Sequence, residues 1–170
     1  MYMTAIGWEH GGGVVSLHEV AERLDREIDY LERMRRESRV GTMAARGVRG
    51  SGPAPLLPQE IGRELQFLRQ LTAGLACTDP GTIWSDRAGF GSVVLARDIA
   101  SGRDRFYKLV ARRLDPLDAA QVALASELGR AFLGRRAGDE VDTGTGAGAR
   151  RLRIVTVKTL PERLRLTPRG

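Results

Sequence analysis

Apolar residues recur at intervals of three and four over two N-terminal stretches of the chain, which is the period of an amphipathic helix. The first stretch follows Ser16 and has the apolar positions Leu17, Val20, Leu24, Ile28, Leu31 and Met34. The second begins near Pro58 and has the stripe Ile61, Leu65, Leu68, Thr72 and Leu75. Ser16 and Glu19 have the spacing of a capping box, which marks a helix start. The pattern therefore predicts two helices.

Neither helix can bury its apolar stripe alone, so we expect the two to pack as an antiparallel coiled-coil hairpin within residues 16–78. The linker Gly41–Pro58 is rich in Gly and Pro, and its only charges are Arg46 and Arg49. It would form the tip of a long finger. The chain has no third or fourth amphipathic helix, which disfavours the alternative of a compact bundle.

The second half of the chain predicts short strands around one short helix. Turn residues at Thr78–Gly81 mark a domain boundary. Strands are expected at Ser92–Arg97 and Arg105–Ala111, joined by the turn residues 98–102 into a hairpin. The Ala-rich residues 119–125 could form either a helix or a strand.

Ser126 can cap a short helix that Gly134 ends. Further strands are expected from Glu140 and over Arg151–Thr159. Strands before and after one helix predict an α+β fold with a small antiparallel sheet domain over residues 81–160. Residues 1–15 are expected to be a flexible N-terminus, and residues 161–170 a loose basic tail.

Composition excludes several classes of protein. The 170 residues are 42% hydrophobic and contain no apolar run that could span a bilayer. A single cysteine, Cys77, gives no disulfide framework, so we expect a cytoplasmic protein with no membrane association. Residues 1–80 contain 10 Lys and Arg against 11 Asp and Glu, whereas residues 81–170 contain 17 against 10. The basic half predicts a nucleic-acid or acidic protein partner, or simply an Arg-rich surface.

No catalytic or cofactor site is evident. His10 and His18 have no second His or Cys at ligand spacing, so no metal site is predicted. No nucleophile–base pair stands out, and the Gly-rich stretch 144–148 lacks the phosphate-loop pattern. We therefore expect no cofactor and no enzyme activity of the chain's own.

Two stretches resemble the C-terminal domain of the bacterial Gre transcription elongation factors (GreA and GreB). They are "VVLARDIASGRDRFYKLV" (Val93–Val110) and "ASELGRAFLGRRAGDEV" (Ala125–Val141). Phe132 is a conservative variant of the family signature, and Glu127 stands where the family usually has Pro. The signature is matched by Ser126, Leu128, Gly129, Ala131, Leu133, Gly134, Gly138, Asp139 and Val141.

The resemblance implies an FKBP-like C-terminal domain that docks on RNA polymerase at the rim of the secondary channel. The coiled coil would enter that channel, with the protein acting as a monomer. It also implies that the docking surface includes the loop entering the signature helix, which comprises Ala125, Ser126, Glu127, Leu128 and Gly129. An FKBP-like fold raises prolyl isomerase as a rival activity, which the few aromatic residues of 81–170 disfavour.

Cleaving members of the family are expected to hold a metal ion with two acidic side chains at the tip. Mg²⁺ requires oxygen ligands, and arginine supplies none. No Asp or Glu occurs between Glu37 and Glu60. The sequence therefore predicts a Gre-like factor that modulates transcription without cleaving RNA, with Arg46 and Arg49 free to contact RNA or nucleotide phosphates. Two alternatives remain: a cleavage-competent factor that uses Glu37 or Glu60, and a basic nucleic-acid-binding protein independent of polymerase.

Overall fold

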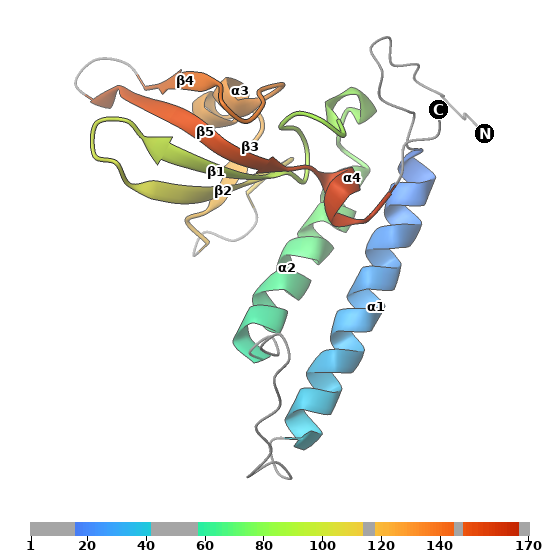
Figure 1. Ribbon diagram of the computed structural model, residues 1–170. Coiled ribbons are helices and arrows are strands. Elements are labelled where there is room, and N and C mark those ends of the chain that lie inside the picture. Colours follow the sequence, from blue (N-terminus) through green and yellow to red (C-terminus); the bar gives the residue numbers. More distant parts are fainter. Residues whose placement is uncertain (1–15, 42–57, 114–117, 145–147, 167–170) are drawn as a thin grey trace.

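The computed structural model describes residues 16–41, 58–113, 118–144 and 148–166, and Figure 1 shows two long helices extending from a small curled sheet. None of the helices in these ranges is long and apolar enough to cross a membrane. The helices are α1 (Leu17–Gly41), α2 (Pro58–Leu75), the 3-10 turn η1 (Pro80–Thr82), α3 (Glu127–Phe132) and α4 (Leu160–Arg163). The strands are β1 (Val93–Asp98), β2 (Asp104–Val110), β3 (Gln121–Ala123), β4 (Glu140–Thr143) and β5 (Arg150–Lys158).

Helices α1 and α2 lie side by side and run in opposite directions, as the two apolar stripes predict (Figure 1). The capping box forms as expected: the Glu19 N–H donates to Ser16 Oγ at 3.1 Å, and the Ser16 N–H donates to Glu19 Oε2 at 3.3 Å. Arg69 of α2 also pairs with Glu32 of α1 at 2.5 Å. The stripe residues buried between the helices are Val20, Leu24, Leu31, Ile61, Leu65, Leu68 and Leu75.

Helix α2 also buries a second face, which the sequence pattern did not indicate. Phe67 and Leu71 are 1% and 0% exposed although both lie outside the predicted stripe. A Cβ added at Gly74 would lie 3.3 Å from both Phe90 and Ala111, so this part of α2 packs closely on the C-terminal half. The same core cluster includes Phe90, Val110 and Leu160. One continuous core therefore joins the base of the finger to the sheet.

The sheet has the strand order β3-β2-β1-β5-β4, and the α+β class is confirmed. Four of the strands pair antiparallel, but β3 pairs parallel to β2 at its edge. Residues 119–125, for which the sequence allowed either a helix or a strand, thus contain a three-residue strand. Helix α3 covers one face of the sheet, where Val94, Ala96, Leu109, Phe132, Leu152 and Ile154 form a second buried cluster.

The prediction of a loose tail after Pro161 is wrong for the residues that the structure describes there. Thr159 caps α4, with its hydroxyl accepting from the Glu162 N–H at 3.3 Å. Leu160 and Leu164 are 1% and 3% exposed in the core beside α1 and α2. Charged residues dominate this segment, but its two leucines determine where it packs. The expected flexible N-terminus, residues 1–15, lies outside the described residues.

Candidate functional site

The loop that enters α3 is held in shape by Ser126. Its hydroxyl accepts a hydrogen bond from the Gly129 N–H at 3.1 Å and donates one to the Ala123 carbonyl at 2.7 Å. The backbone of Ser126 is extended, with φ −71° and ψ 162°, as an N-cap residue requires. The predicted cap is therefore present, and both polar functions of the Ser126 side chain are used within the loop.

Gly129 is buried and has a packing role. A Cβ at this position would lie 2.1 Å from the Ala123 carbonyl oxygen and 2.8 Å from Leu124 Cα. No side chain fits there without moving the backbone. The absence of a side chain lets α3 lie directly against the end of β3.

The exposed part of this loop is small and well defined. Ala125 and Glu127 are exposed, and Leu128 is partly buried against the sheet cluster. The Arg130 guanidinium donates to the Ala125 carbonyl at 2.7 Å, which fixes the loop from the other side. Of the five residues predicted to dock, three can present a side chain outward: Ala125, Glu127 and Leu128.

Glu127, the residue that departs from the family signature, makes a contact that its sequence position did not suggest. Its Oε1 accepts a hydrogen bond from the backbone N–H of Gly144 at 3.1 Å. Gly144 follows β4 and has φ +82°, in the left-handed region that favours glycine. The side chain of Glu127 thus joins the first turn of α3 to the loop after β4.

The charged residues at the tip of the finger are placed only in part. Arg46 and Arg49 lie outside the described residues. Glu37, near the end of α1, and Glu60, in the first turn of α2, are both exposed. Among the described residues, no group of three or more His, Cys, Asp or Glu side chains could hold a metal ion.

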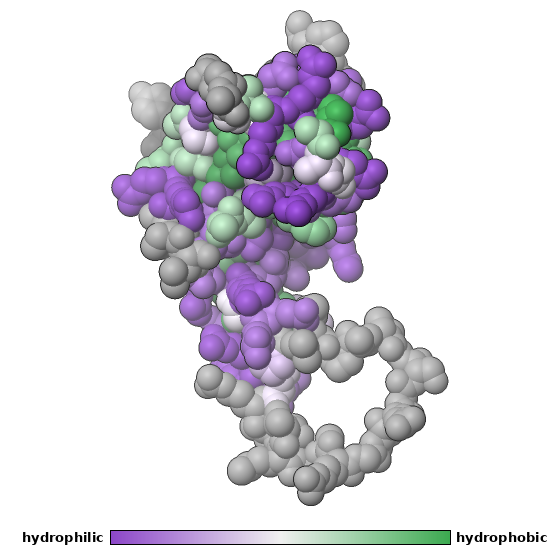
Figure 2. Space-filling model, turned by 90° about the vertical axis from the view of Figure 1, so that its left-hand side faces the viewer, coloured by the Kyte–Doolittle hydropathy of each residue, from purple (hydrophilic) through white to green (hydrophobic). Residues whose placement is uncertain are grey.

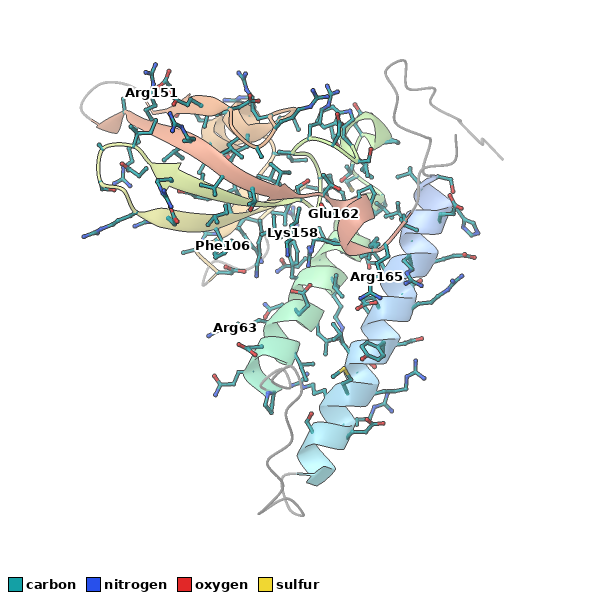
Figure 3. The ribbon with its side chains drawn as sticks, in the orientation of Figure 1. Arg63, Phe106, Arg151, Lys158, Glu162 and Arg165 are labelled. Atoms are coloured by element: carbon teal, nitrogen blue, oxygen red, sulfur yellow. The ribbon has the colours of Figure 1, made fainter. Side chains whose placement is uncertain are left out.

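An exposed aromatic residue lies on the sheet face opposite α3, and sequence reasoning missed it. Phe106 is 61% exposed and projects away from that face (Figure 3). The alternation of the strand could have indicated this position, because successive strand residues point to opposite faces of a sheet. Since Tyr107 and Leu109 point toward α3, Phe106 must point away from it.

Ion pairs cross the sheet beside Phe106. Arg97 donates to both carboxylate oxygens of Asp104, at 2.7 and 2.9 Å, and this hydrogen bonding lowers the pKa of Asp104. Arg153, opposite Arg97 in the register, pairs with Glu140 at 2.6 Å. Two acidic residues thus flank two adjacent arginines across four strands, which offsets the repulsion between the arginines.

Comparison with known proteins agrees with this arrangement. A family model described as "Transcription elongation factor, GreA/GreB, C-term" matches residues 84–159, which include the whole sheet and α3. Residues 84–159 are therefore similar to the C-terminal domain of the Gre transcription elongation factors.

Individual relatives match over part of their length. The chain is 33% identical to the transcription elongation factor GreA of Desulfotalea psychrophila over 73 residues, which cover 43% of this chain and 45% of that protein. It is 28% identical to the GreA of Syntrophus aciditrophicus over 100 residues, or 57% and 62% of the two chains. The chain thus spans less than two thirds of the length of these relatives.

Two solved structures are also similar. One is the GreA factor homolog 1 (Gfh1) protein of Thermus thermophilus, with 22% identity, a TM-score of 0.39, and coverage of 84% of this chain and 92% of that one. The other is the GreA/GreB elongation factor of Nitrosomonas europaea, with 28% identity, a TM-score of 0.39, and coverage of 54% and 78%.

Proposed function

We propose that this chain is a Gre-type transcription factor that binds RNA polymerase at the rim of the secondary channel and modulates transcription without cleaving RNA. One observation carries the proposal: a chain with a GreA/GreB C-terminal domain has no Asp or Glu between Glu37 and Glu60. That segment joins the two helices of the finger.

The chemistry of RNA cleavage supports this interpretation. Phosphoryl transfer with two metal ions requires the second ion to be held by oxygen ligands. The linker offers Arg46 and Arg49 instead, and guanidinium groups repel Mg²⁺. Cations at this position would bind phosphate oxygens of RNA or of a nucleotide. Such contacts would affect pausing or initiation.

The C-terminal domain would supply the docking contact. Ala125, Glu127 and Leu128 are the outward residues of the loop before α3, and Ser126 and Gly129 maintain its shape. Because these two residues have internal roles, their match to the family signature supports a preserved loop shape. The contact itself would then depend on the three outward residues.

A cleavage assay on stalled elongation complexes tests the catalytic part of the proposal. A GreA relative serves as the positive control, and both factors are used at concentrations that saturate the polymerase. We expect shortened transcripts with GreA and none above background with this chain. Shortened transcripts with this chain would reject the non-catalytic function and favour Glu37 or Glu60 as metal ligands.

Association with polymerase core tests the binding part separately. We expect the tagged chain to co-purify with core enzyme after nuclease treatment. Association that disappears when nucleic acid is removed would instead support a nucleic-acid-binding protein that does not contact polymerase. A further control is competition: excess GreA should displace this chain if both occupy the same rim.

A further inference from the structure

A cavity of about 530 Å³ opens on the sheet at the turn between β1 and β2. This is the end of the sheet farthest from the two long helices in Figure 1, and Arg151 marks the β5 side of it in Figure 3. Neither the docking loop nor the finger contributes a residue to its lining. Its volume falls within the usual range for small-molecule sites, which is about 300–1,000 Å³.

Strand alternation explains why a cavity forms here. The register pairs Ala96 with Arg105, Val94 with Tyr107 and Asp98 with Leu152, so all six point to the face that α3 covers. Phe132 of α3 packs on Tyr107 with ring centroids 5.1 Å apart. Beyond that contact the cavity is lined by Ala96 and Leu152, which are nearly buried, and by residues of the β1–β2 turn.

The rim of this cavity carries unpaired positive charge. Arg103, Arg105 and Arg150 line it and are exposed, and none has an ion-pair partner in the part of the chain that the structure describes. Most other arginines of the sheet differ: Arg97, Arg151 and Arg153 each pair with a carboxylate on a neighbouring strand. Figure 2 views the molecule from this end and shows hydrophilic and hydrophobic residues interspersed over it.

Among the described residues that line the cavity, the acidic one is Asp98, and its carboxylate already accepts hydrogen bonds. Asp98 Oδ1 accepts hydrogen bonds from the N–H groups of Ala100 and Ser101, at 3.0 and 2.9 Å. These bonds close the β1–β2 turn. The backbone hydrogen bond from Ser101 is the main cause of the lowered pKa of Asp98, and the charge of Arg150 adds to it. Asp98 feels the charge of Arg150 but forms no ion pair with it, and among the described residues Arg103 and Arg105 also have no carboxylate in ion-pair contact, so these guanidinium groups can accept an anion from solution.

We propose that this cavity binds a small nucleotide, with its phosphates at Arg103, Arg105 and Arg150 and its base against Tyr107 and Ile99. Guanidinium groups bind phosphate oxygens through paired N–H donors, and several of them favour a polyanion. Tyr107 is held by Phe132, and Ile99 is 44% exposed at the edge of the cavity, so both offer apolar surface to a planar ring. The site is independent of polymerase docking.

Titration calorimetry of the full chain with ATP, tripolyphosphate, adenosine and a single-stranded RNA oligomer tests the proposal. Arg105→Ala and Arg150→Ala should each weaken ATP binding by about tenfold, the loss expected for one charge-assisted contact. Arg135→Ala removes the same charge from an exposed position outside the cavity and should leave ATP binding unchanged.

A nuclear magnetic resonance titration locates the site independently of affinity. We expect ATP to shift the signals of Ala96, Tyr107 and Leu152 in the wild-type chain. Undetectable ATP binding, an equal loss in the Arg135→Ala variant, or shifts confined to other residues would each overturn the proposal. Equal affinity for tripolyphosphate would reject the base contact, and tighter binding of RNA than of ATP would reject a small-molecule site.

Discussion

Glu127 and Gly144 are 17 residues apart in the chain, and a single hydrogen bond of 3.1 Å joins the carboxylate of one to the backbone N–H of the other. Glu127 is the first residue of α3 and stands where the related signature usually has Pro. This contact connects the proposed docking loop to the loop after β4. The side chain of Glu127 therefore has a structural role in this chain.

Glu127→Pro should fold normally and bind polymerase more tightly than the wild-type chain. Proline is well tolerated at the first position of a helix, and the extended backbone of Ser126 suits the residue before a proline. The lost hydrogen bond is exposed, so the change in unfolding free energy should be within about 1 kcal/mol. Urea unfolding and a binding titration with core polymerase measure the two effects. Weaker binding of a folded variant would show that Glu127 itself contributes to docking.

Ala125→Arg tests whether this loop is the contact surface at all. Ala125 is exposed, so the larger side chain should leave stability unchanged while obstructing a close protein contact. We expect polymerase affinity to fall at least about tenfold, as for loss of a central interface contact.

The matched control is Phe106→Ser, on the opposite face of the sheet. It should leave polymerase affinity unchanged, because Phe106 lies away from α3 and its loop. If Phe106→Ser abolished binding and Ala125→Arg did not, the docking surface would have to be assigned to the Phe106 face.

Gly129→Ala should be strongly destabilising because its Cβ would lie 2.1 Å from the Ala123 carbonyl oxygen. Either the backbone of α3 or the backbone at Ala123 and Leu124 would have to move. We therefore expect a loss of about 3 kcal/mol or more in unfolding free energy. Gly62→Ala in α2 is the control, since a Cβ there would meet nothing within 4 Å. It should stabilise the helix by about 0.5–1 kcal/mol. Similar unfolding midpoints for the two variants would contradict the packing role of Gly129.

The sequence predicted the elements well where a repeating pattern determines them. The 3-4 spacing located both long helices, and Ser16, Ser126 and Gly134 marked helix ends that the structure confirms. The family signature identified the C-terminal domain that residues 84–159 match.

What the sequence missed depends on contacts between distant segments. Phe67 and Leu71 look like exposed positions of a two-helix hairpin until the sheet domain packs against them. Strand β3 has only three residues, too few to show a period. The contact of Glu127 with Gly144 and the spatial grouping of Arg103 and Arg105 with Arg150 arise from the sheet register. A pattern among residues that are neighbours in the sequence does not predict any of these contacts.

Arg163→Met should weaken the attachment of the finger to the sheet. The guanidinium of Arg163 pairs with Glu64 of α2, lies 4.8 Å from the Phe67 ring centroid and donates to the Gly91 carbonyl at 3.4 Å. This side chain is only 16% exposed, so we expect a loss of about 1–3 kcal/mol in unfolding free energy. Arg153→Met is the control, because Arg153 forms an exposed ion pair with Glu140. This substitution should lower the unfolding free energy by less than about 1 kcal/mol. Equal losses would mean that Arg163 acts as an ordinary surface charge.

The unfolding free energy of the protein should fall in acid, in part because Asp118 becomes protonated there. Burial alone would raise the pKa of Asp118, but the Ala120 N–H at 3.0 Å and the Lys108 ammonium at 3.2 Å outweigh it and lower the pKa. A carboxyl whose pKa is lower in the folded state stabilises that state above its unfolded pKa, about 3.9 for Asp. The contribution is lost as pH falls through the folded pKa.

Asp118→Asn should therefore lower the unfolding free energy at neutral pH and flatten its decline in acid, because the variant has no carboxylate at this position to protonate. Urea unfolding at several pH values between neutrality and strong acid measures this slope. Asp104→Asn is the comparison, since Asp104 also pairs with a cationic side chain, Arg97, but its own side chain is more exposed than that of Asp118, at 39% against 25%. Solvent screens the Asp104 pair, so its removal should change the slope less. A larger change for Asp104→Asn than for Asp118→Asn would contradict the stabilising role of the Lys108–Asp118 pair.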